Sequence, residues 1–106
     1  MLIAVASTDG EMVNEHFGRA TRFWIYDISG SKQSLIKVRN VEPLSTGDKN
    51  HPFNAERMGS VTEAIKDCQQ VYCTRIGDRP REELKKKGIT TVIYNDAIKS
   101  ITLENT

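Results

Sequence analysis

The chain has 106 residues, of which 38% are hydrophobic and 27% charged, and its formal net charge is +1. This composition indicates one globular domain over residues 1–106, long enough for a single core and too short for two. The near-neutral charge supplies no global field for nucleic acid or an anionic membrane surface. Neither a run of about 18 apolar residues nor a signal peptide is present, so we expect a cytoplasmic protein that has neither nucleic acid nor a membrane as a partner.

The hydrophobic pattern predicts an α/β fold with a mixed sheet. Residues 2–6 are apolar without alternation, which indicates a central strand covered on both faces. The turn residues 29–32 favour a hairpin, so the strands on either side are expected to be antiparallel neighbours. In chain order we predict strands over residues 2–6, 23–28 and 35–41, a helix over 54–66, a strand over 71–73, a helix over 78–87, a strand over 89–94, and a short last helix from 96.

Particular residues mark the faces and ends of these elements. In the second strand, side chains alternate between the two faces of the sheet. Phe23 and Ile25 are therefore expected on one face and Trp24, Tyr26 and Ile28 on the other. Lysine and arginine alternate with apolar residues in the third strand, which indicates a position at the sheet edge. Asn54 and Asp78 are predicted N-caps of the two helices, and a lysine run followed by glycine ends the second.

The two cysteines, Cys68 and Cys73, are five positions apart. If residues 71–74 are extended, their Cα atoms lie beyond the roughly 7 Å limit for a disulfide, so free thiols are expected. The spacing is not that of a zinc knuckle. We expect Cys68, at a helix end, to be structural.

The candidate site centres on His16, one of two histidines, which is followed by Phe17, Gly18 and Arg19 between two predicted strands. Ligands of such sheets bind beyond the carboxyl ends of the parallel strands. If the first and fourth strands are neighbours, His16 meets Cys73 at one rim. A helix start and the cations of that region would favour an anion there.

Two further groups complete this hypothesis. Arg75 and Gly77 lie in the loop after the fourth strand, and His51 lies in the longest loop, over residues 42–53, from which it could close over the rim. Imidazole and thiolate ligands ringed by positive charge suit an anionic metal–sulfur species. His16, Cys73 and His51 are the candidate metal ligands.

Other interpretations of these residues are available from the sequence. Cys73 in an apolar strand also fits a small buried hydrophobe, and the arginines also fit a solvated surface. Asp9 and Asp27 could be read as paired carboxylates of a metal-dependent nuclease, but aspartate is expected in turns for backbone reasons. No phosphate-binding loop, dinucleotide motif or nucleophile elbow is present, so we expect no enzyme activity.

Several stretches resemble the dinitrogenase iron–molybdenum cofactor biosynthesis family, which includes the NifX-type carriers and the C-terminal domain of NifB. In the first half these are residues 3–7, 9–10, 13–18 with the His-Phe-Gly motif, and 23–27. In the second half they are residues 65–68, the Val-Tyr-Cys block at 71–73, Ile76-Gly77, and Leu84 with Gly88-Ile89. The resemblance therefore covers nearly the whole chain.

This resemblance implies a ribonuclease H-like three-layer sandwich: a five-stranded mixed sheet with an antiparallel hairpin and flanking helices. It also implies a non-catalytic carrier for an iron–sulfur or iron–molybdenum cluster, with cofactor-assembly proteins as partners. In that reading His16 is the family's motif histidine and Cys73 matches a second family position. The alternative is a regulatory or adaptor domain that binds a partner protein through the hairpin or the long loop, without a cluster.

Overall fold

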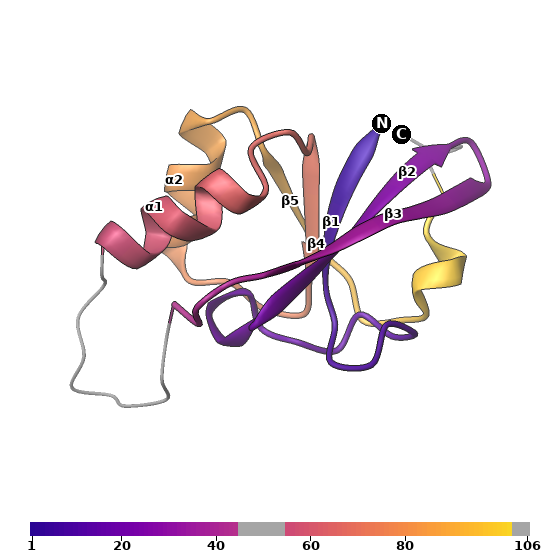
Figure 1. Cartoon of the computed structure of the whole chain (residues 1–106), viewed down its shortest axis with the longest axis horizontal. Coiled ribbons are helices and arrows are strands. Elements are labelled where there is room, and N and C mark those ends of the chain that lie inside the picture. Colours follow the sequence, from indigo (N-terminus) through magenta and orange to yellow (C-terminus); the bar gives the residue numbers. More distant parts are fainter. Residues whose placement is uncertain (45–54, 103–106) are drawn as a thin grey trace.

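The computed structural model describes residues 1–44 and 55–102 (Figure 1). The predicted order of strands and α-helices is confirmed as far as residue 94, with boundaries that differ by a few residues, whereas the predicted last helix is a 3-10 turn. The strands are β1 (Leu2–Ala6), β2 (Arg22–Ser29), β3 (Lys32–Asn40), β4 (Gln70–Cys73) and β5 (Thr90–Ile93), the α-helices are α1 (Ala55–Ala64) and α2 (Asp78–Lys86), and two 3-10 turns are η1 (Phe17–Arg19) and η2 (Ile98–Ser100).

The five strands form one mixed sheet in the order β3-β2-β1-β4-β5. β1 pairs antiparallel with β2 and parallel with β4, and β4 pairs parallel with β5. The expected central position of β1 is confirmed, because the side chains from Ile3 to Ala6 are 0% exposed. β3 is an edge strand, as its alternating charges predict, and its register against β2 shifts between Ile25 and Tyr26.

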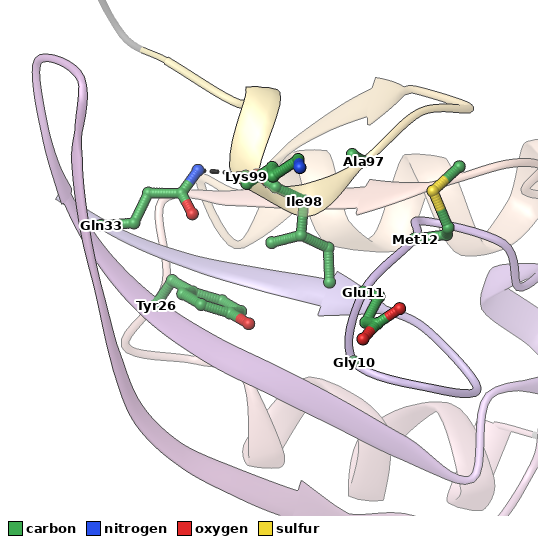
Figure 2. Close-up of a pocket in the computed structure, with 8 residues that line it drawn as sticks. All are labelled: Gly10, Glu11, Met12, Tyr26, Gln33, Ala97, Ile98 and Lys99. Carbon is green, nitrogen blue, oxygen red and sulfur yellow. Dashed lines mark hydrogen bonds between the residues drawn. The ribbon is translucent and has the colours of Figure 1, made fainter.

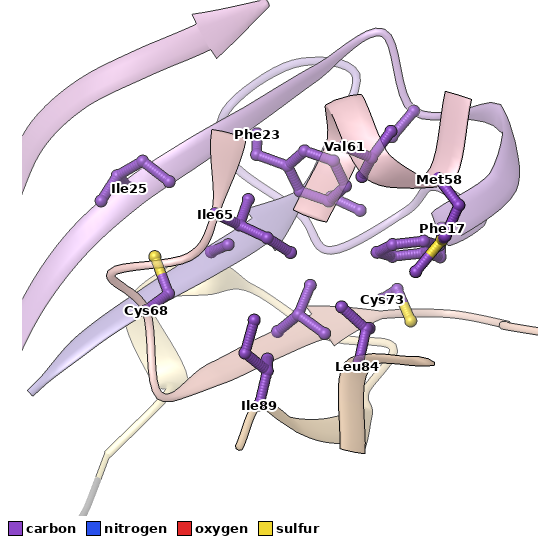
Figure 3. Close-up of a cluster of buried hydrophobic side chains, with 14 residues drawn as sticks. Phe17, Phe23, Ile25, Met58, Val61, Ile65, Cys68, Cys73, Leu84 and Ile89 are labelled. Carbon is purple, nitrogen blue, oxygen red and sulfur yellow. The ribbon is translucent and has the colours of Figure 1, made fainter. Parts of the chain in front are cut away.

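The two faces of the sheet carry separate apolar clusters. Phe23 and Ile25 join the cluster beneath the helices, which contribute Met58, Val61 and Leu84 (Figure 3). Trp24, Tyr26 and Ile28 belong to the cluster on the other face, where Val13, Ile98 and Ile101 cover the sheet. The predicted alternation of β2 is therefore confirmed.

The covering layers differ from the expected sandwich. In Figure 1 both α-helices lie on one side of the sheet, and the 3-10 turn η2 lies on the other. The predicted last helix is thus a single 3-10 turn, although its two isoleucines are buried as expected. Within the described residues, α-helices cover one face only, and on the other face the buried side chains of Ile98 and Ile101 pack against the sheet.

The turns follow their local chemistry with one exception. Gly30 has a φ of 61° in the two-residue turn between β2 and β3, and Gly88 has a φ of 79° after α2. Both are in the left-handed region that favours glycine. The expected cap Asp78 is wrong: Gly77 is the N-cap of α2 and Asp78 is the first helical residue. Asn54, the other predicted cap, lies outside the described residues.

Both cysteines are free and buried, as expected. No helix in the described part of the chain is long and apolar enough to cross a membrane.

Candidate functional site

The segment after β1 is a turn organised by Asp9. The Asp9 Oδ1 atom accepts hydrogen bonds from the backbone N–H groups of Glu11 (2.9 Å) and Met12 (3.0 Å). Those two donors are the main reason that the pKa of the Asp9 carboxyl is lowered. Asp27 pairs instead with the N-terminal amine at 3.3 Å, beside the first residue of β1. The two carboxylates therefore lie at opposite ends of β1, which contradicts the paired-carboxylate interpretation.

Beyond this turn the chain returns to the carboxyl end of β4. The N–H of Thr74 donates to the Glu15 carbonyl at 3.1 Å, and the N–H of Phe17 donates to the Arg75 carbonyl at 2.8 Å. His16 and Arg75 thereby form a parallel bridge outside the regular strands. The two loops predicted to converge at one rim are in direct backbone contact.

The Phe17 side chain packs in the core beneath this bridge. It is 1% exposed, and its ring lies 5.6 Å from that of Phe23, centroid to centroid. Figure 3 shows it in the same buried cluster as Met58 and Leu84. Phe17, predicted as a binding residue, is therefore a core residue that fixes its neighbours His16 and Gly18 at the surface.

The surface above the Phe17 side chain is a shallow depression of about 280 Å³, lined by His16, Gly18, Arg19, Arg75, Ile76 and Gly77. Arg19 and Arg75 are exposed, and His16 is half-buried. At one wall α2 begins at Asp78 after the N-cap Gly77, which has no side chain to accept hydrogen bonds from the first N–H groups at the positive end of the helix dipole. An imidazole, two guanidinium groups and a helix N-terminus together favour an anionic ligand.

Cys73 lies behind this depression and does not line it. Its side chain is 0% exposed within the helix-side cluster (Figure 3). Burial raises the pKa of the Cys73 thiol to about 11, although the nearby N–H groups of Arg75 and Phe17 act in the opposite direction. A thiol with a pKa of about 11 is protonated at neutral pH. Burial also raises the pKa of Cys68 to about 12.

Of the predicted metal ligands, His51 lies outside the described residues. Within residues 1–44 and 55–102, no three side chains of histidine, cysteine, aspartate or glutamate lie close enough to hold a metal ion. A metal-containing ligand in the depression would therefore be held by few protein atoms. It would depend mostly on charge and hydrogen bonding.

A larger cavity, of about 490 Å³, was not predicted from the sequence; it is lined by Gly10, Glu11, Met12, Tyr26, Gln33, Ala97, Ile98 and Lys99. Figure 2 shows the Tyr26 ring and Ile98 facing its middle, with Gln33 and Glu11 at opposite ends. The Gln33 amide donates to the carbonyls of Ile98 (2.6 Å) and Ile101 (2.8 Å), which attaches η2 to β3. The cavity shares no residue with the depression and carries charges of both signs, so it suits an anion less well.

Comparisons with known proteins identify the family. The family model described as "Dinitrogenase iron-molybdenum cofactor" matches residues 1–102. The FeMo cofactor biosynthesis protein NifB of Frankia alni is 35% identical over 98% of this chain and 20% of its own length. NifB of Klebsiella pneumoniae is 37% identical over 83% of this chain and 19% of its own. The chain thus spans about a fifth of these curated relatives.

Two solved structures are similar to this fold. The crystal structure of PH0822 has a TM-score of 0.63 and 28% identity, and the match covers 87% of this chain and 77% of that one. The NMR structure of a Thermotoga protein provisionally described as NifB has a TM-score of 0.59 over 92% of this chain and 80% of that one. At 20% identity, this second likeness concerns the fold alone.

Proposed function

Because this chain belongs to the dinitrogenase iron–molybdenum cofactor family, we propose that it is a carrier for an anionic metal–sulfur cofactor and that it performs no chemistry on its cargo. The cargo is an iron–sulfur or iron–molybdenum cluster on its way to nitrogenase, and cofactor-assembly proteins are the donor and acceptor. The names of the NifB relatives support the pathway. The compartment proposed is the cytoplasm, where free thiols are stable.

The observation that carries this proposal is the depression that joins His16, Arg19 and Arg75 at the carboxyl ends of β1 and β4. The His16 imidazole supplies a nitrogen that can coordinate iron. The two guanidinium groups supply fixed positive charge and hydrogen-bond donors for sulfide or carboxylate atoms of the cargo. The open shape of the depression suits a ligand that must be handed to another protein.

The thiol and the second histidine have smaller parts in the proposal. Coordination by Cys73 would require the buried thiol to lose its proton and to become accessible, so the proposal rests on His16. A contribution from His51 remains a prediction.

We further infer that the sheet is of the ribonuclease H-like type. The strand order β3-β2-β1-β4-β5, with β2 as the single antiparallel strand, supports this inference. No nuclease activity follows, since Asp9 and Asp27 are far apart and are used by the backbone and the N-terminus. The adaptor alternative is not favoured by the family match, which names a cofactor.

The test is anaerobic mixing of the protein with a preformed iron–sulfur cluster stabilised by a small thiol, followed by gel filtration. We expect visible absorbance and iron to co-elute with the protein. His16→Ala should weaken binding by more than about 1 kcal/mol, roughly fivefold, the scale for losing a charged or coordinating contact. Adding Arg75→Gln to His16→Ala should weaken cluster binding further.

Two variants serve as controls. Lys99→Gln removes a cation from the other cavity and should leave binding unchanged, and His51→Ala reports separately on the second imidazole. Unchanged affinity in His16→Ala would remove His16 from the site. No binding by the unmodified protein, with any cluster offered, would overturn the carrier function.

A further inference from the structure

A third cavity lies beside the edge strand β5, beneath α2. Its volume is about 340 Å³, and it is lined by Arg81, Lys85, Gly88, Ile89, Thr90 and Thr91. It shares no residue with the depression at His16 or with the cavity of Figure 2. It is therefore a separate feature, which the carrier function does not use.

The first observation concerns charge. Arg81 and Lys85 are four positions apart, so they project from one face of α2, and both line the cavity. Neither side chain has a hydrogen bond or an ion pair with any residue in the described part of the chain, whereas the side chain of the adjacent Lys86 pairs with Glu83 at 3.4 Å. Like charges at this spacing repel each other. An anion bound between the two side chains would relieve this repulsion.

The second observation concerns the hydroxyl of Thr91. Among the described residues, its Oγ1 is the one buried side-chain oxygen or nitrogen without a hydrogen-bond partner. Thr91 is aligned with Val71, which belongs to the helix-side cluster, so its side chain also faces α2. A buried hydroxyl without a partner is destabilising, and such a group in a native protein calls for a partner.

The backbone adds a donor at the same place. Thr90 and Tyr94 donate their N–H groups to carbonyls at 69 and 73, on the β4 side. In a parallel ladder the intervening residues point the other way, so the N–H of Thr91 faces the unpaired edge of β5. Two cations and a hydroxyl thus line one cavity, a backbone N–H lies at the neighbouring strand edge, and none of the described side chains that line the cavity is a carboxylate.

We propose that this cavity is a second ligand site, which binds an oxyanion such as a phosphate or carboxylate group. Arg81 forms the paired hydrogen bonds that a guanidinium makes with such groups, and Lys85 neutralises the remaining charge. The Thr91 hydroxyl donates the hydrogen bond that it lacks within the protein. A cationic ligand is excluded by the charge of the walls.

The experiment is thermal unfolding of the whole chain at pH 7 in sodium phosphate, sodium succinate, and sodium chloride at matched ionic strength. We expect phosphate or succinate to raise Tm saturably above the chloride value, and the more effective of the two identifies the class of oxyanion. Amide NMR signals of Arg81, Lys85 and Thr91 should shift in the same titration. No rise above chloride with either anion would overturn the site.

Variants locate the effect. Arg81→Gln and Lys85→Gln should each weaken anion binding at least tenfold, whereas Lys86→Gln, on the same helix, should not. Thr91→Val should be at least as stable as the parent in chloride, because an unpaired hydroxyl is lost, yet should lose most of the anion-induced rise. His16→Ala should keep the full response, so the two sites can fail independently. A response that survives the double variant of Arg81 and Lys85 would refute the assignment.

Discussion

Gly10 offers the sharpest test of how the loop before the candidate site is built. Its φ is 76°, and a Cβ placed on it would lie 2.6, 2.8 and 3.0 Å from three atoms of the Trp24 ring. The ring cannot move away freely, because the Trp24 Nε1 donates to the Ser7 carbonyl at 3.1 Å and the side chain packs on the sheet. Gly10→Ala therefore combines backbone strain with a steric clash.

The magnitude can be separated into these two parts. A non-glycine residue in the left-handed region costs roughly 1–2 kcal/mol, and overpacking typically adds about 1–3 kcal/mol. Gly30 is the matched control: its φ is 61° and a Cβ on it would meet nothing within 4 Å. We expect Gly10→Ala to lower the free energy of unfolding by about 2–5 kcal/mol and Gly30→Ala by about 1–2 kcal/mol.

The assay is urea unfolding followed by Trp24 fluorescence and by circular dichroism. In a Trp24→Leu background, where circular dichroism alone follows unfolding, the clash is removed, so the loss caused by Gly10→Ala should fall to that of Gly30→Ala. Equal losses for Gly10→Ala and Gly30→Ala in the unmodified protein would refute the role given to the Trp24 ring.

Three further expectations follow from burial and pairing. Phe17→Ala should lower the free energy of unfolding by about 3–5 kcal/mol, because the ring is in the core. His16→Ala, at a half-buried surface position, should change it by less than about 0.5 kcal/mol. Similar losses for the two variants in urea unfolding would contradict this division. Arg39 holds the pKa of Asp67 at about 2 through hydrogen bonds of 2.6 and 2.8 Å. Because this folded-state pKa is depressed, the stabilisation is present above the unfolded value near 4 and is lost as the pH falls toward 2. Asp67 is 43% exposed, so we expect the parent to lose only about 0.5–1 kcal/mol more than Asp67→Asn over that range, measured by unfolding at several pH values. Both cysteine thiols are buried with raised pKa values, so a thiol reagent at pH 8 should modify neither in the folded protein and both in urea; rapid labelling of the folded protein would contradict their placement.

The element order was available from the sequence because it depends on local patterns. The unbroken apolar run at residues 2–6 and the alternation of Phe23, Trp24 and Ile25 are consequences of which faces each strand buries. The turn at Gly30 and the stop at Gly88 follow from the conformational freedom of glycine. The edge position of β3 was likewise visible in its alternating charges.

The predictions of the cap of α2 and of the last helix were wrong for reasons that local sequence patterns do not contain. Asp78 has the right chemistry for a cap, but the backbone is still extended at Gly77 and already helical at Asp78, so Gly77 is the N-cap. The segment around Ile98 has the spacing of a helix, yet it forms a 3-10 turn whose two isoleucines pack against the face of the sheet opposite the helices, a tertiary contact that overrides the local preference.

For the site, residue types alone identified His16, Arg19 and Arg75 as candidates, and the parallel pairing of β1 with β4 made their convergence foreseeable. Only the tertiary structure decided that Phe17 and Cys73 face the core while their neighbours face the depression, because burial depends on what packs above each strand end. The unpaired hydroxyl of Thr91 and the cavity beside β5 were equally inaccessible to sequence reasoning. A hydrogen bond that is missing between residues far apart in the chain leaves no trace in either local sequence.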